Sequence, residues 1–157
     1  MTIRKVEIER FSATSSKSFE AVVAALEAAV GHPDIVEFGK GIKGAQSFAE
    51  LESAVQKGLG RTGLMMFRVL DHGAILGKET GLNTPKIVRF VIGNPLVMKE
   101  MVRLVPDAGS YAPVTILVDE RADGVHLSYD KMASLLASHG NLGALAAARD
   151  LDSKIKT

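Results

Sequence analysis

A predicted β-hairpin in the last third of the chain most constrains what this sequence can fold into. The dipeptide Asp123-Gly124 separates two apolar segments, residues 113–119 and 125–129. Asp-Gly between two such segments is a strong signal for a tight turn between strands. Because a hairpin is antiparallel, the sheet is not the wholly parallel sheet of a doubly wound fold. The sequence therefore favours a mixed, largely antiparallel sheet.

Other segments supply further strands and the helices that cover them. Apolar runs and period-two alternation predict strands over residues 3–11, 34–38, 64–70 and 87–92. Helical periodicity begins after a Ser-rich stretch at 12–18 and ends at Gly31, since glycine tolerates the left-handed conformation that closes many helices. The chain has 157 residues, enough for one domain with a real core. We expect a single α+β domain over residues 1–157, a two-layer sandwich of about 5–6 strands backed by helices.

Composition narrows the class of function. The net charge is +1, aromatic residues make up 5% of the chain, and cysteine is absent. A nearly neutral chain with few aromatics lacks both the basic surface and the stacking platforms of nucleic-acid-binding proteins. Without cysteine there is no thiolate nucleophile and no cysteine-based metal site, and no two histidines have the i, i+4 spacing of metal ligands on one helix. We expect neither a metal nor a nucleic-acid partner.

The chain carries no signal for a membrane or for secretion. No apolar run reaches the roughly 18–20 residues that span a bilayer. Residues 1–10 alternate charged and aliphatic side chains and lack the apolar core of a signal peptide. We therefore expect a cytoplasmic protein.

Three short motifs lie at junctions between a predicted strand and a predicted helix. They are Asp71-His72-Gly73, Ile92-Gly93-Asn94-Pro95 and Leu127-Ser128-Tyr129-Asp130. In each motif one residue is suited to capping the helix that follows, namely Asp71, Asn94 and Asp130. Strand ends and helix N-termini also favour polar or anionic ligands. We expect the three motifs to line one cleft that binds a small polar or anionic ligand.

Capping does not account for every residue in or near these motifs. His72 follows Asp71, which can orient its imidazole, so His72 is the candidate general acid or base. Arg89 stands alone inside an apolar strand and needs an acceptor, a cleft or a partner chain. Tyr129 either hydrogen-bonds a ligand or closes a core edge with its hydroxyl in water. The candidate ligand-binding residues are therefore Asp71, His72, Arg89, Asn94 and Tyr129.

Residues 39–44 match the G-x-G-x-x-G pattern of dinucleotide sites. The strand predicted before them is weak, and the capping box Ser47-Phe48-Ala49-Glu50 places the helix start after the third glycine. The acidic residue at the next strand end, Asp71, lies farther along the chain than the usual spacing of about 20 residues. We interpret this segment as a flexible loop and assign no cofactor to it.

Taken together, the motifs resemble those of a known family. The succession of Asp71-His72-Gly73, Ile92-Gly93-Asn94-Pro95, Tyr111-Ala112-Pro113 and Ser128-Tyr129-Asp130 is similar to the landmarks of the domain of unknown function 302 (DUF302) family. The resemblance covers nearly the whole chain and implies a two-layer fold, a sheet backed by helices, and a homodimer. It implies no reaction, cofactor or catalytic residue. The chain departs from the family pattern at Ile92, where phenylalanine is common, and at Met132, where proline often stands.

Three functions are compatible with the sequence. The leading hypothesis is a homodimeric ligand-binding domain with its cleft at the strand-to-helix junctions. The second is an enzyme that uses His72 as general acid or base, which requires an open pocket and a nearby acceptor at that residue. The third is a protein that works through partner proteins, with the motifs serving only as caps and turns.

Overall fold

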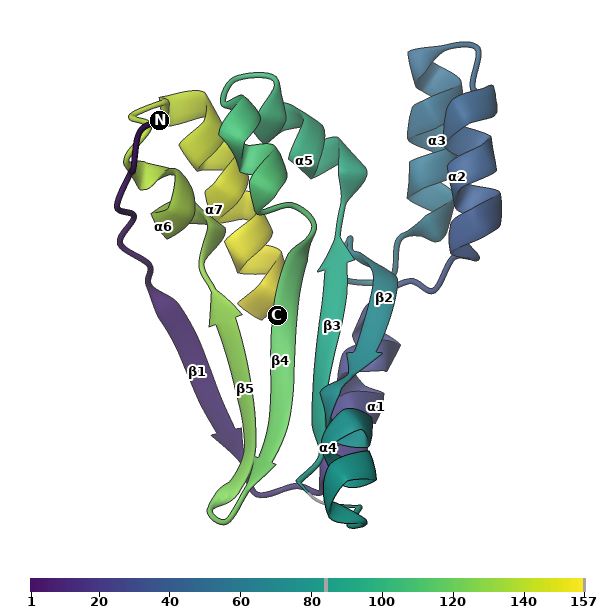
Figure 1. Cartoon of the computed structure of the whole chain (residues 1–157). Helices are drawn as coiled ribbons and strands as arrows, with labels where there is room; N and C mark the ends of the chain where they lie inside the picture. Colours follow the sequence, from purple (N-terminus) through teal and green to yellow (C-terminus); the bar gives the residue numbers. More distant parts are fainter. Residues whose placement is uncertain (84, 157) are drawn as a thin grey trace.

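The computed structural model describes residues 1–83 and 85–156. In chain order the elements are β1 (Arg10–Ser15), α1 (Phe19–Ala29), α2 (Ile35–Gly44), α3 (Phe48–Gly58), β2 (Met65–Asp71), α4 (His72–Thr80), β3 (Ile87–Gly93), α5 (Pro95–Val102), the 3-10 helix η1 (Pro106–Ser110), β4 (Val114–Arg121), β5 (Gly124–Asp130), α6 (Met132–Ala137) and α7 (Leu142–Lys156). The strands form a central sheet, and α5, α6 and α7 gather at one end of it (Figure 1). The helical hairpin α2–α3 stands beside this group.

The sheet has the strand order β1-β5-β4-β3-β2, and each of its four strand pairs is antiparallel. The hairpin predicted around Asp123-Gly124 is confirmed as β4–β5, in which Arg121 pairs with Gly124. An isolated bridge between Gly31 and Met65 is parallel. The α+β class is thus confirmed, with a five-stranded sheet that is antiparallel along each of its ladders.

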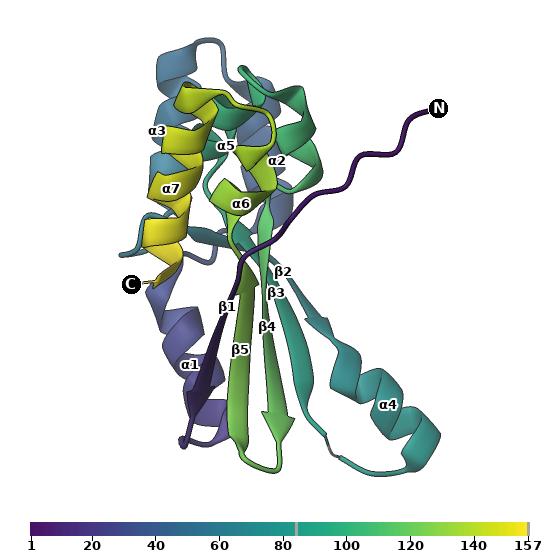
Figure 2. The ribbon, with the colours of Figure 1, turned by 90° about the vertical axis from the view of Figure 1, so that its left-hand side faces the viewer.

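Period-two alternation gives the sheet one buried face and one open face. Phe90, Ile116 and Tyr129 lie in one cross-strand row and are all buried. Arg89 lies in the next row, on the opposite face, and is exposed. Helix α1 packs on the buried face, and Figure 2 shows it on the other side of the sheet from α4. The apolar core therefore lies between one face of the sheet and the helices, while the other face stays open.

The strand predicted over 34–38 and the loop predicted over 39–44 are wrong, because these residues form α2. Asp34 caps the helix, since one carboxylate oxygen accepts hydrogen bonds from the N–H groups of Val36 and Glu37 at 3.0 Å each. Each glycine lowers helix propensity by about 1 kcal/mol relative to alanine, yet packing against α3 outweighs that cost. The G-x-G-x-x-G pattern lies within a helix and forms no phosphate-binding turn.

The first strand lies later in the chain than the predicted range 3–11. It spans Arg10–Ser15 because its partner β5 offers pairing positions only from Gly124 to Asp130. The residues before it run along α6, where the Glu9 N–H donates to Ser134 Oγ at 3.0 Å and the Glu9 carbonyl accepts from the Lys131 N–H at 2.9 Å. The N-terminal segment thereby reaches the helical end of the molecule.

Candidate functional site

The three motifs do not meet in one cleft. Asp71 ends β2 and pairs with Val88 near the start of β3, whereas Asn94 directly follows the end of β3. A strand rises about 3.4 Å per residue, so Asp71 and Asn94 lie on the order of 20 Å apart. Tyr129 lies toward the Asn94 end, because it pairs with Ile116 near the start of β4. A separate cavity lies at or next to each motif instead.

The first motif caps a helix and leaves its histidine without a partner. Asp71 Oδ1 accepts from the Ala74 N–H at 2.9 Å and so caps α4, as predicted. His72 begins α4 and is partly exposed, and its imidazole makes no hydrogen bond with the described residues. A cavity of about 400 Å³ is lined by residues of α1, by the start of α4 and by Asp71, but not by His72. The carboxylate expected to orient His72 holds the helix, and this geometry gives the enzyme hypothesis no support.

The second motif is held in place by its asparagine. Asn94 Oδ1 accepts from the Leu96 N–H at 2.9 Å and caps α5, as predicted. Asn94 Nδ2 donates to the Gly63 carbonyl at 2.9 Å. Both ends of the side-chain amide are therefore engaged within the protein. A small cavity of about 170 Å³ lies beside Asn94 at the end of β3.

The third motif leads to a buried hydrogen-bond cluster. Tyr129 is 3% exposed, and its hydroxyl donates at 2.5 Å to Oδ1 of Asp152, which is 5% exposed. The same carboxylate accepts from the Met132 N–H at 2.8 Å and the Ala133 N–H at 3.1 Å. Burial, and next the hydrogen bond to Asp152, raise the pKa of the Tyr129 hydroxyl well above its ordinary value. Asp152 thus caps α6 and ties α7 to the sheet.

The prediction that Asp130 caps the helix after it is wrong. Lys131 occupies the capping position of α6 and makes no side-chain hydrogen bond there. Asp130 instead pairs across the sheet with Arg10, whose Nε and Nη2 donate to its two carboxylate oxygens at 2.6 and 3.0 Å. This bidentate pair takes up both oxygens of Asp130, and the first amides of α6 are left for Asp152.

Asp152 is not among the candidate site residues inferred from the sequence. The buried positions of α7 are Ala144, Ala148, Leu151 and Asp152. A carboxylate on the apolar side of a predicted helix was the available sign, because a buried carboxylate needs hydrogen-bond donors. Its donors come from β5 and α6, so their identity depends on the fold.

A pocket of about 430 Å³ lies next to this cluster, between α6 and α7, and is named here the α6–α7 pocket. Its charged lining residues are Glu9, Lys131, Arg149, Asp152 and Lys156. Glu9 and Lys131 form an ion pair, and the hydrogen bond between them lowers the pKa of Glu9 and raises that of Lys131. Arg149 and Lys156 form no ion pair with the described residues. The charged residues of the lining therefore sum to +1, three cations against two carboxylates, and two of the cations lie outside the ion pair.

Two classes of site are absent from residues 1–83 and 85–156. These residues include no group of three or more His, Asp or Glu side chains placed to hold a metal ion. They also include no helix that is long and apolar enough to cross a membrane.

Comparison with known proteins assigns the family. No curated protein matches the chain. A crystal structure of an uncharacterised conserved DUF302 protein from Bacillus stearothermophilus has a similar fold, with a TM-score of 0.62 and 14% sequence identity over 94% of this chain and 92% of that one. The model of the family described as Domain of unknown function DUF302 matches residues 42–157. That match covers all elements from α3 onward, and the chain belongs to the DUF302 family.

Proposed function

We propose that the protein is a binding domain for a small organic anion, which it holds in the α6–α7 pocket. The observation that carries the proposal is the charge of the lining, which sums to +1 and in which Arg149 and Lys156 form no salt bridge with the described residues. Glu9 is already paired with Lys131, and Asp152 already accepts three hydrogen bonds. A carboxylate or phosphate group would supply the missing partner, and the arginine fork suits either one.

The remaining lining residues suit a ligand that is partly apolar. Ala133, Ala137 and Leu145 line the same pocket. Its volume of about 430 Å³ falls in the range of roughly 300–1,000 Å³ that small-molecule sites occupy. A headgroup at Arg149 and Lys156 would leave room for a chain of a few carbons. A short-chain carboxylate such as hexanoate has this shape and is the probe of choice.

Binding of hexanoate is expected to weaken at least about ten-fold when Arg149→Glu and Lys156→Glu are combined, because like charges then face the headgroup. Isothermal titration calorimetry at constant ionic strength measures the change. Inorganic phosphate, titrated in parallel, tests whether the headgroup alone is enough.

The matched control is Lys154→Glu on the same helix. Lys154 pairs with Asp150 at 3.2 Å and does not line the pocket. Hexanoate affinity should be unchanged in this variant. An equal loss in the control, or no binding by the unaltered protein, would contradict the proposal.

We also propose that the chain forms a homodimer through the open face of its sheet. Arg89 is exposed there, and its guanidinium makes no hydrogen bond or ion pair with the described residues. Its cross-strand neighbours Leu70 and Leu117 are partly exposed on the same face. A second copy related by a twofold axis would cover this row and bring its own acceptors to Arg89.

Leu117→Glu is expected to convert the dimer to a monomer, because it places a charge in the middle of the proposed interface. Light scattering would then give a mass near 16.7 kDa in place of twice that value. Leu142→Glu is the matched control, since Leu142 is 83% exposed at the start of α7, away from the sheet. A monomeric unaltered protein, or dissociation by the control, would refute the interface.

A further inference from the structure

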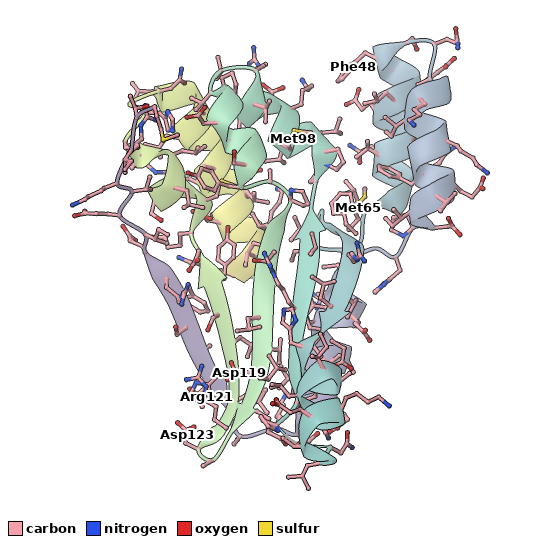
Figure 3. The ribbon with its side chains drawn as sticks, in the orientation of Figure 1. Phe48, Met65, Met98, Asp119, Arg121 and Asp123 are labelled. Carbon is pink, nitrogen blue, oxygen red and sulfur yellow. The ribbon has the colours of Figure 1, made fainter. Side chains whose placement is uncertain are left out.

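We infer that the protein carries a second binding site, the small cavity at the end of β3, which takes an uncharged aromatic ring. The cavity lies where β3 meets α5 and α7 and has a volume of about 170 Å³. Its lining includes Phe67, Asn94, Met98, Met101, Val114 and Leu151, and Met98 extends from α5 (Figure 3). An apolar cavity of about 150 Å³ is large enough to admit benzene.

The polar side chain in the lining of this cavity, that of Asn94, is already satisfied. Asn94 uses its Oδ1 to cap α5 and its Nδ2 to hold the Gly63 carbonyl. The Ala112 N–H donates to the Ala108 carbonyl at 3.1 Å. Among the described residues, no buried side-chain nitrogen or oxygen lacks a hydrogen-bond partner. Because an ordered water needs about two to four polar partners, the cavity favours an apolar occupant.

Buried residues close the inner end of the cavity, and partly exposed residues line its opening. The inner residues Met101, Val114 and Leu151 are each at most 4% exposed. Phe67 and Met98 are partly exposed, and Phe67 lies at a β-bulge in β2, an irregularity that redirects a side chain. Methionine is flexible, and its sulfur makes favourable contacts with the edges of aromatic rings. This lining suits a flat ring better than a branched aliphatic molecule.

The cavity is separate from the α6–α7 pocket. Leu151 lines the cavity, whereas the next residue of α7, Asp152, lines the pocket. Consecutive helical residues point about 100° apart, so the two sites lie on different sides of α7. One is cationic and the other apolar, so each selects a different ligand.

Benzene titrated into the full chain, labelled with ¹³C at the methionine methyl groups, tests the inference. The chain has six methionines, and saturable chemical-shift changes are expected for Met98 and Met101. The methyl groups of Met1 and Met132, which do not line the cavity, should stay unchanged. Shifts that rise linearly without saturation, or that spread evenly over all six methyl groups, would overturn the inference.

Filling the cavity supplies the second test. A Cβ atom at Gly93 would lie 3.5 Å from the Phe67 ring and 3.5 Å from Pro113 Cβ, which is ordinary contact distance. Gly93→Ala should therefore fold and weaken benzene binding at least about ten-fold. Gly39→Ala is the matched control, because nothing lies within 4 Å of that position.

If Gly93→Ala does not fold, Met98→Phe is the variant that tests whether benzene binds in this cavity, because its ring fills the cavity from α5. Unchanged benzene affinity in a folded cavity-filling variant, or an equal loss in Gly39→Ala, would show that benzene binds elsewhere. Both results would overturn the inference.

Discussion

Asp152→Ala is expected to lower the free energy of unfolding by about 3 kcal/mol. The carboxylate is 5% exposed and accepts hydrogen bonds from the Tyr129 hydroxyl and from the N–H groups of Met132 and Ala133. Hydrogen bonds to a charged group contribute about 1.5–3 kcal/mol each, and their loss leaves buried donors without an acceptor. Relief from burying the charge offsets part of this loss. Denaturant unfolding followed by circular dichroism measures the change.

Asp150→Ala is the matched control for that variant. Asp150 lies two residues earlier on α7, is exposed, and pairs with Lys154 at the surface. Exposed ion pairs contribute at most about 1 kcal/mol, so the control should lose little stability. If the two variants were equally stable, Asp152 would not be the residue that ties α7 to the sheet.

Gly31→Ala is expected to lower the free energy of unfolding by about 3 kcal/mol or more. A Cβ atom there would lie 1.9 Å from the Gly58 carbonyl oxygen and 2.8 Å from the Gly60 nitrogen. These are backbone atoms, so the clash is relieved only if the chain itself moves. The contact is held by hydrogen bonds from the Gly31 N–H to the Leu64 carbonyl at 2.8 Å and from the Met66 N–H to the Gly31 carbonyl at 2.7 Å. Overpacking typically costs about 1–3 kcal/mol, and rigid surroundings raise that cost.

Gly39→Ala separates this clash from the general effect of replacing a glycine. Gly39 lies inside α2 with nothing within 4 Å of the added methyl group. Alanine there should raise the free energy of unfolding by about 0.5–1 kcal/mol, because it restricts the unfolded chain and favours the helix. Thermal unfolding of both variants tests whether Gly31→Ala lowers stability while Gly39→Ala raises it. A loss of stability of similar size in both variants would contradict the close approach at Gly31.

Short-range signals in the sequence were sound guides to the fold. Asp71 and Asn94 cap α4 and α5 because a cap bonds to N–H groups only two or three residues away. The hairpin at Asp123-Gly124 is similarly local. Ser47 also caps α3, although the Glu50 carboxylate accepts a hydrogen bond from the Gln46 N–H rather than from the Ser47 N–H.

Local signals gave wrong predictions at two positions where contacts with distant residues determine the structure. Gly31 was predicted to adopt a left-handed conformation after a helix, but it is not among the glycines with positive φ. Its lack of a side chain is needed for the close approach to Gly60 instead. Asp130 had the right position for a cap, yet Arg10 from the edge strand β1 binds it.

By itself, the sequence determined the α+β class, the antiparallel hairpin and most helix starts, because these depend on residues within a few positions of one another. Only the tertiary structure decided where the candidate sites lie. It placed the Asp152 carboxylate against the Tyr129 hydroxyl and brought Glu9 to Lys131. It also set the Asp71 motif at the opposite end of the sheet from the other two motifs. These pairings join distant parts of the chain, and the burial that makes them favourable exists only after the sheet and helices have packed.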